Sequence, residues 1–246
     1  MTILVAFVEG TQWSLITFVS ICVAIAVAFV AAAASATSSR LATVRVSIRL
    51  TIGIALYCTA IAWLVQSGLF ERAFIPYGPL FLVGSVSLAA TLGFTRIGYQ
   101  VANSLPIACL VLFQGFRLPL ELVLHDWYVS GTIPESMTWS GSNWDIASGI
   151  LACLLFPFAG KHRWIAWSFN IVGILLLLNV GRVAVLSSPL PFGWRVDPPL
   201  ELIVHLPYAF IVPICVGGAA LGHVLLTRRL LTSEPSLHHS RNEKHN

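Results

Sequence analysis

The stretch "WSLITFVSICVAIAVAFVAAAAS" at residues 13–35 decides the fold class, because it runs for 23 residues without a charged side chain. A helix needs about 20 apolar residues to cross a hydrocarbon core about 30 Å thick. Arg40, Arg45 and Arg49 follow the run and no basic residue precedes it, which favours a retained span over a cleaved signal peptide. The stretch therefore predicts a transmembrane helix.

The rest of the chain has the same character. Its 246 residues are 57% hydrophobic and 10% charged, with a mean hydropathy of +0.85, whereas about 25% of the residues of a soluble domain are charged. The five cysteines lie singly in apolar runs, so no disulfide framework is indicated. The sequence predicts an all-α, polytopic integral membrane protein with seven transmembrane helices, near residues 13–35, 50–70, 77–95, 101–125, 144–159, 164–187 and 199–227.

The basic residues predict the orientation. With the N-terminus outside and the C-terminus cytoplasmic, Arg72 and Arg195 flank outer ends of spans, and the cytoplasmic ends carry eight basic residues, Arg40, Arg45, Arg49, Arg96, Lys161, Arg163, Arg228 and Arg229. An excess of Lys and Arg marks cytoplasmic loops. We therefore expect a multi-pass protein of the bacterial plasma (inner) membrane.

Two segments are expected, a seven-helix transmembrane domain at 1–231 and a disordered cytoplasmic tail at 232–246, which is polar and lacks apolar periodicity. The basic cytoplasmic face suits anionic lipid, so the lipid bilayer is the expected partner. Basic and aromatic residues do not interleave as they do in nucleic-acid-binding surfaces, so nucleic acid is not expected. The sequence leaves the oligomeric state open.

An unusual polar stripe lies in the fourth apolar run, "FRLPLELVLHDW" at residues 116–127. Arg117, Glu121 and His125 recur every four residues and share one side of a helix. Pro119 lies within the stripe and is expected to kink the helix. Ionisable residues inside a span usually mark a functional site, so this stripe is the first candidate.

A similar pattern opens the seventh run, "PPLELIVH" at residues 198–205. If the two helices are neighbours, Glu121, His125, Glu201 and His205 face each other and could bind a divalent metal such as zinc or iron. Alternatives are an Arg117–Glu121 salt bridge with the other residues at the wet interface, or a site for proton transfer or anion binding. The sequence does not choose between them.

Further polar residues are expected at the same depth. Asn179 and Arg182 lie near the outer end of the sixth run, and Asp145 opens the fifth. Arg182 needs a partner within the membrane, and Glu121, Asp145, Glu201 or an anionic ligand could serve. Asp145 also suits the first turn of a helix, where it complements the helix dipole. Together these residues predict a polar chamber open to the outside.

Two resemblances accompany these patterns. The segment from "FRLPLELVLH" through "GTIPESMTWSGSNWDIASG" resembles a group of uncharacterised bacterial multi-span proteins with no assigned activity. A weaker pattern, Ser148-Gly149-Ile150, then Asn179-x-x-Arg182-Val183, then His205, is similar to the exosortase and archaeosortase proteases. Those proteases have a catalytic cysteine where this chain has Ala147, so their cysteine chemistry is not expected here.

The favoured hypothesis is an enzyme whose site near the outer leaflet acts on a lipid-like or small anionic substrate. Its catalytic residues would be Glu121, His125 and Asp145, and its substrate-binding residues Arg117, Asn179 and Arg182. A transporter or ion-coupled or proton-coupled carrier is the first alternative, because ionisable residues line such pathways. A receptor or an assembly subunit is the second.

Overall fold

The computed structural model describes residues 7–232, and these residues form helices and connecting segments without a strand. The predicted disordered tail at 232–246 lies outside the described residues except for Thr232, which is the last residue of a helix and so is not part of such a tail. The elements, with short 3-10 or π-helical segments marked η, are α1 (Gln12–Ser35), α2 (Arg40–Gln66), α3 (Leu69–Arg72), α4 (Phe74–Phe94), α5 (Arg96–Ser104), α6 (Ile107–Phe113), η1 (Gln114–Phe116), α7 (Arg117–Val129), η2 (Glu135–Met137), α8 (Ile146–Ala159), α9 (Arg163–Ser187), η3 (Leu202–Val204), η4 (Tyr208–Phe210), η5 (Ile211–Val216) and α10 (Gly217–Thr232).

Six of the helical segments in this part of the chain are long and apolar enough to cross a membrane, which confirms the all-α class and agrees with a multi-pass membrane protein. They are Gln12–Ser35, Arg40–Gln66, Phe74–Phe94, Ile107–Val129, Arg163–Ser187 and Tyr208–Thr232. The fifth predicted run forms α8, an apolar helix of 14 residues. At 1.5 Å per residue it is about 21 Å long, which is shorter than a hydrocarbon core.

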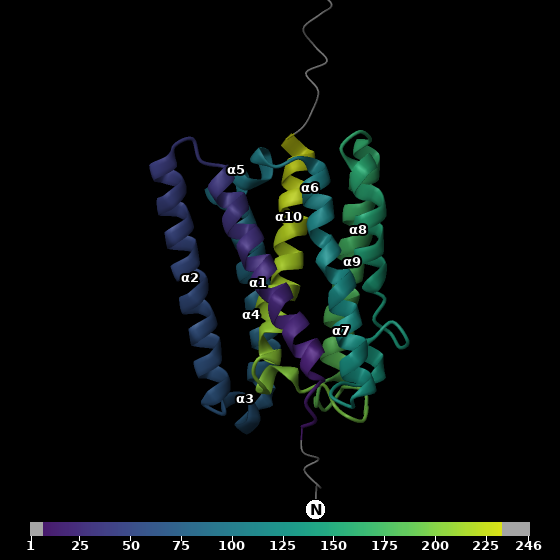
Figure 1. The fold of residues 1–246 in the computed structure, drawn as a ribbon. Helices are drawn as coiled ribbons and strands as arrows, with labels where there is room; N and C mark the ends of the chain where they lie inside the picture. Colours follow the sequence, from purple (N-terminus) through teal and green to yellow (C-terminus); the bar gives the residue numbers. More distant parts are fainter. Residues whose placement is uncertain (1–6, 233–246) are drawn as a thin grey trace, which may run out of the picture.

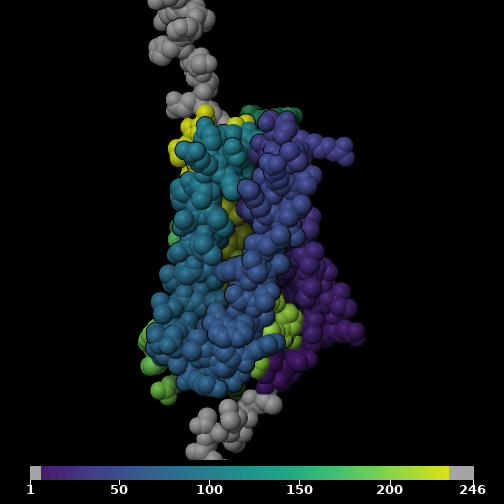
Figure 2. All heavy atoms as spheres, turned by 90° about the vertical axis from the view of Figure 1, so that its left-hand side faces the viewer, coloured from purple at the N-terminus to yellow at the C-terminus, as the bar shows by residue number. Residues whose placement is uncertain are grey.

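The helices stand side by side, and α1 begins at the opposite end of the bundle from the end of α10 (Figure 1). The last span, Tyr208–Thr232, is central, with 78% of its most apolar window buried, whereas α2 is peripheral, with 11% buried. Figure 2 shows the face formed by α2 and α4, where atoms of α10 are visible between the two helices. The bundle is therefore built around the C-terminal helix.

The fourth span is interrupted where the sequence predicts a kink. A 3-10 turn at Gln114–Phe116 separates α6 from α7, and Pro119 lies in the first turn of α7. Proline is tolerated in a first turn, where its missing N–H would have no partner in the helix. The 3-10 turn comes directly before α7, which carries Arg117 and Glu121.

The seventh predicted run begins later than expected. The helix starts at Tyr208, so Glu201 and His205 belong to a connecting segment that includes η3. Pro198, Pro199 and Pro207 flank this segment, and proline disfavours helix both at its own position and at the preceding residue. The predicted Glu-x-x-x-His face on a second helix is therefore wrong.

Two hydrophobic clusters form most of the core. One contains side chains from α1, α7, the segment between α7 and α8, and residues 200–215, and it includes Trp127. Trp127 is fully buried, contacts the rings of Phe18 and Tyr208, and donates to Ser14 Oγ. The other cluster joins α6, α8, α9 and the C-terminal half of α10, including Val111, Phe169 and Leu226. The polar stripe of α7 begins between these clusters.

Candidate functional site

A buried ion pair forms the centre of the site. Arg117 Nε lies 2.9 Å from Asp145 Oδ2, and Arg117 Nη1 donates to Ser148 Oγ at 2.8 Å. Arg117 is 1% exposed and Asp145 6%. The close approach of α7 and α8 permits this pairing, because an added Cβ at Gly149 would lie 2.5 Å from Leu118 N. The salt bridge is thus made to Asp145, so the sequence-based alternative of an Arg117–Glu121 pair is wrong.

Glu121 is held by an amide. Asn143 Nδ2 donates to Glu121 Oε1 at 2.9 Å and to the carbonyl of Met137 at 3.0 Å. Asn143 Oδ1 accepts from the backbone N–H of Asp145 at 3.2 Å. Asn143 is fully buried and Glu121 is 1% exposed. Asn143 therefore fixes the carboxyl group of Glu121 beside the Arg117–Asp145 pair.

A line of hydrogen bonds leads from Arg117 toward the Thr232 end of the bundle. Arg117 Nη1 lies 3.5 Å from His223 Nε2, and His223 Nδ1 lies 2.9 Å from Asn170 Oδ1. Asn170 Nδ2 donates to Thr227 Oγ1 at 2.7 Å. Arginine can only donate, so Nε2 of His223 accepts and the ring carries its proton on Nδ1. The permanent charge of Arg117 thus fixes the tautomer of a buried histidine.

An apolar groove adjoins the charged residues. It encloses about 940 Å³ of space between atoms, including the part that is open to the outside, and Arg117, Glu121 and Asp145 line it. The walls are apolar side chains of α4 and α9 and of the segment before α10, including Phe74, Leu82, Leu177, Val180, Ala184, Leu202, Ile203 and Ile211. The groove therefore combines an apolar wall with a buried charged end.

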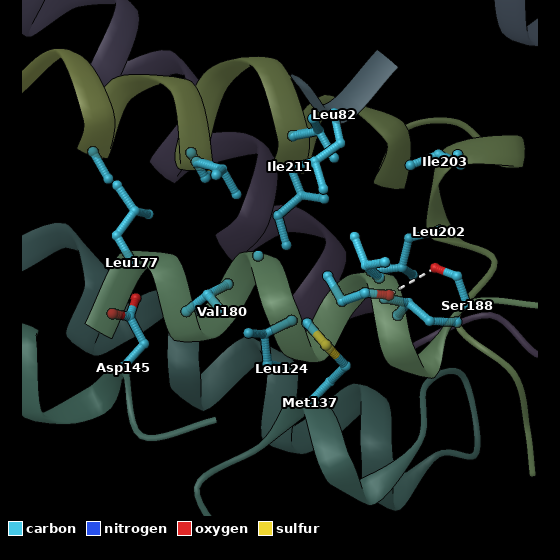
Figure 3. A pocket seen from close by; sticks show the side chains of 18 of the residues that line it. Leu82, Leu124, Met137, Asp145, Leu177, Val180, Ser188, Leu202, Ile203 and Ile211 are labelled. Atoms are coloured by element: carbon cyan, nitrogen blue, oxygen red, sulfur yellow. Dashed lines mark hydrogen bonds between the residues drawn. The ribbon is translucent and has the colours of Figure 1, made fainter. Parts of the chain in front are cut away.

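Figure 3 shows how the lining residues are arranged. Asp145 lies beside Leu177 at one end, and Ser188 lies near Leu202 and Ile203 at the other. An added Cβ at Gly181 of α9 would meet nothing within 4 Å, although Gly181 lines the groove. The absence of a side chain there keeps the middle of the groove open.

Three polar atoms of the lining residues lack a hydrogen-bond partner. They are Arg117 Nη2, Glu121 Oε2 and Asp145 Oδ1, and all three atoms are buried. Buried polar groups nearly always have a partner, because leaving one unsatisfied costs about 1–3 kcal/mol. All three residues line the groove, so the unpartnered atoms belong to side chains at its charged end.

The predicted substrate-binding residues of α9 do not join this cluster. Arg182 is exposed, donates to Asn179 Oδ1 at 2.8 Å and lies 5.8 Å from the ring centroid of Trp194. Asn179 donates to the carbonyl of Ser142 at 2.8 Å, which fastens the segment between α7 and α8 to α9. Of the partners expected for Arg182, the carboxylates of Glu121, Asp145 and Glu201 are therefore wrong, because Arg182 is exposed and contacts Asn179 instead.

The predicted metal residues are also separated. His125 stacks on Trp139 with ring centroids 4.4 Å apart, and His205 stacks on Phe7 at 3.7 Å. Among residues 7–232, no group of three or more His, Cys, Asp or Glu side chains is placed to hold a metal ion. Glu121, His125, Glu201 and His205 therefore do not form the predicted ligand set, because the last two lie outside any helix that faces α7.

His205 lies at the Gln12 end of the bundle, outside the membrane-spanning segments. Burial lowers the pKa of its imidazole below the usual value, and the nearby carboxylates of Glu201, Glu71 and Glu9 oppose this effect. The lowered pKa indicates that burial outweighs these charges. The neutral form is therefore favoured in the folded protein.

Sequence reasoning missed two residues of the cluster, His223 and Asn170. His223 resembles an interfacial residue in the sequence, yet it is 2% exposed, and an added Cβ at Gly173 would clash with its ring. A possible signal was the polar spacing of Asn170 and Gly173 in an otherwise apolar run. Ser148 was noted only within the protease-like pattern.

Comparisons with known proteins place the chain in a family. The family model described as "Domain of unknown function (DUF8737)" matches residues 77–231, so the chain belongs to this family. The matched region contains the whole charged cluster and all of the groove except Phe74. No curated protein and no solved structure matches the chain.

Proposed function

We propose that this protein binds a lipid-like molecule in the groove between α4 and α9 and acts on it as a membrane-embedded enzyme. The observation that carries the proposal is the junction of an apolar groove with Arg117, Glu121 and Asp145, each of which has one unpartnered buried polar atom. A pocket of apolar walls with a few convergent polar groups is the usual form of a ligand site. An amphiphilic molecule matches both parts.

Glu121 is the proposed acid or base. Asn143 holds one carboxyl oxygen, and the other oxygen has no partner in the described part of the chain. A carboxyl group fixed in this way can take a proton from, or give one to, a ligand placed within hydrogen-bond reach. Arg117, fixed by Asp145 and Ser148, would position the polar end of the ligand.

The topology belongs to the same proposal. We propose that the protein lies in the inner membrane of a bacterium and crosses it seven times, with α8 as the shortest span. The N-terminus would lie outside and the C-terminus in the cytoplasm. The eight basic residues near the proposed cytoplasmic ends support this orientation. Along the span Ile107–Val129, Glu121 lies on the Val129 side of Arg117, and Val129 is at the end of the bundle where α1 begins. In the proposed orientation the site is therefore in the outer half of the bilayer.

The experiment is a comparison of lipid profiles. Proteoliposomes made from a bacterial lipid extract would be incubated with wild-type protein or with Glu121→Gln, and the lipids would be analysed by mass spectrometry. We expect a lipid species to be consumed or formed with wild type and to remain unchanged with Glu121→Gln. Identical profiles for wild type and for protein-free liposomes would contradict the enzyme.

A retention assay tests the binding step separately. Wild type, Gly181→Trp and Gly53→Trp would be purified in detergent, and the lipid that remains bound would be measured. Gly181 opens into the groove, whereas Gly53 faces open space on α2, so the second variant controls for a bulky side chain. We expect only Gly181→Trp to lose lipid. Equal retention by all three proteins would contradict the groove as the binding site.

A carrier is the second candidate, and one observation favours it. The contacts from Arg117 through His223 and Asn170 to Thr227 extend polar groups toward the opposite end of the bundle. Polar chains across a membrane are typical of transport pathways. Concentration-dependent counterflow of a solute into proteoliposomes, abolished by Asn170→Leu, would support the carrier over the enzyme.

A further inference from the structure

We infer that the charged end of the groove takes an uncharged or cationic group, such as a hydroxyl or an amine on a single-chain lipid, and excludes carboxylates and phosphates. This inference rests on the proposed function and defines its substrate class. It also departs from the anionic substrate that the sequence suggested.

The charged end of the groove carries no excess positive charge. Arg117 is the single basic residue among the described residues that line the groove, and two carboxyl groups, Asp145 and Glu121, line it as well. The net charge is −1 with Glu121 ionised and 0 with Glu121 protonated. Arg182, which would have supplied a second positive charge, pairs with Asn179 on the outside of α9. In neither state is the cluster positive.

The elements that surround the cluster do not change this balance. The residues that α4 and α9 contribute to the groove are uncharged. On the side of α10, His223 accepts from Arg117 and is therefore neutral there. The positive charge of Arg117 is already paired with the carboxylate of Asp145, whose Oδ2 lies 2.9 Å from Arg117 Nε. An anionic group would have to be buried without a free countercharge, which is strongly unfavourable in an apolar medium.

The free atoms describe the group that fits. Arg117 Nη2 can only donate, while Glu121 Oε2 and Asp145 Oδ1 accept when ionised. A hydroxyl can donate to one carboxylate oxygen and accept from the guanidinium at the same time. An ammonium group can donate to both oxygens and would balance the excess negative charge. A carboxylate has no proton to donate, so it would leave both acceptors unsatisfied and repel them.

The shape of the groove selects a single chain. Its wall along α9 runs from Leu177 to Ser188, the residue that follows the helix, and eleven residues of helix are about 16 Å long. Figure 3 shows apolar side chains along this length, with the carboxyl group of Asp145 at the end where Leu177 lies. Ser188 at the other end already donates to the carbonyl of Ala184 at 2.7 Å. One alkyl chain with its polar group beside Asp145 matches this layout.

The test compares three probes with the same alkyl chain, namely hexadecanol, hexadecylamine and hexadecanoate. Equilibrium binding of radiolabelled probe to the purified full chain would be measured in detergent at pH 7.5. We expect saturable binding of the alcohol and the amine, and binding of the carboxylate at least about tenfold weaker, which corresponds to about 1.4 kcal/mol. Glu121→Gln should reduce the difference in affinity between hexadecylamine and hexadecanoate, because the substitution removes one negative charge from the groove.

Two matched variants separate groove binding from partition into micelles. Gly181→Trp should abolish saturable binding of all probes, and Gly181→Leu should weaken it, whereas Gly53→Trp should bind as wild type does. Binding of hexadecanoate as tight as that of hexadecanol, lost in Gly181→Trp, would overturn the headgroup inference and leave the proposed groove intact. No saturable binding of any probe, or binding that Gly181→Trp does not change, would overturn the proposed binding site itself.

Discussion

Arg117 and Asp145 form a buried ion pair across the contact between α7 and the start of α8, with 2.9 Å between Nε and Oδ2. Removal of one partner leaves a buried charge without compensation, which lowers the free energy of unfolding by about 3–5 kcal/mol. Replacement of both partners by apolar residues often leaves the stability unchanged. The pair therefore holds the start of α8 against α7, because Arg117 on α7 needs the carboxylate of Asp145 to compensate its buried charge.

The first prediction concerns this pair. Asp145→Leu should lower the free energy of unfolding by about 3–5 kcal/mol, and the double variant Arg117→Leu with Asp145→Leu should recover most of this loss. Reversible unfolding in mixed micelles, followed by tryptophan fluorescence, measures both values. Arg182→Ala is the control, because an exposed arginine should change stability by less than about 0.5 kcal/mol. A double variant as unstable as Asp145→Leu would contradict the predicted coupling.

The second prediction concerns the contact that makes the pairing possible. Gly149→Ala places a Cβ 2.5 Å from Leu118 N, so α8 must shift away from α7. Overpacking of this kind costs about 1–3 kcal/mol. In Gly53→Ala the new Cβ meets nothing within 4 Å, and stability should rise slightly, because alanine favours helix over glycine. Equal thermal midpoints for the two variants would show that the backbones of α7 and α8 are not in close contact.

The third prediction concerns His223. In His223→Leu, Asn170 loses its donor and Arg117 loses an acceptor, so the free energy of unfolding should fall by about 1–3 kcal/mol. His223→Asn should lose less, because an asparagine amide can reproduce the donor at Nδ1 but cannot reach Arg117. Denaturant titration of the two variants provides the comparison. If the asparagine variant were the less stable one, the assigned tautomer would be wrong.

The fourth prediction concerns pH. Burial lowers the pKa of His205 in the folded protein, so the unfolded chain binds a proton more readily at this position. The stability that neutral His205 contributes is fully present above its ordinary pKa of about 6.5 and is lost as the pH falls from there through the folded pKa. We expect the thermal midpoint of wild type to fall between pH 7 and pH 5.

A matched variant assigns this effect. His205→Gln keeps a polar side chain against Phe7 but does not titrate, so its midpoint should fall less than that of wild type over the same pH interval. The midpoint should be recorded at constant ionic strength, because Glu9, Glu71 and Glu201 act on His205 through charge. A midpoint for wild type that rises on acidification would mean that these carboxylates outweigh burial.

The membrane fold could be predicted from the sequence, and the pairings within it could not. The run at 13–35 and five others stand out because apolar length alone decides whether a helix can span a bilayer. Arg117 and Glu121 could be singled out because charge inside a span is rare. Their contacts with Asp145 and Asn143 depend on how the start of α8 packs against α7, and this packing cannot be deduced from a single sequence.

The errors have local physical causes. The spacing of Glu201 and His205 has meaning only on a helix, and prolines delay that helix until Tyr208. The π-helical segment Ile211–Val216 follows, and its wider turns rotate every later residue relative to an α-helix. Helical periodicity counted from Glu201 therefore could not show that His223 faces Arg117.

The two hydrophobic clusters are separate, and Arg117 lies between them on its span, after Val111 of one cluster and before Leu120 of the other. The same boundary occurs on the last span between Cys215 and Leu225, where His223 lies. The protein thus has a polar seam between two apolar halves, and hydrogen bonds at the seam join them. A ligand that forms hydrogen bonds with the unpartnered polar atoms at this seam would hold the two apolar halves together. Binding of such a ligand should therefore slow amide hydrogen exchange at both ends of the bundle.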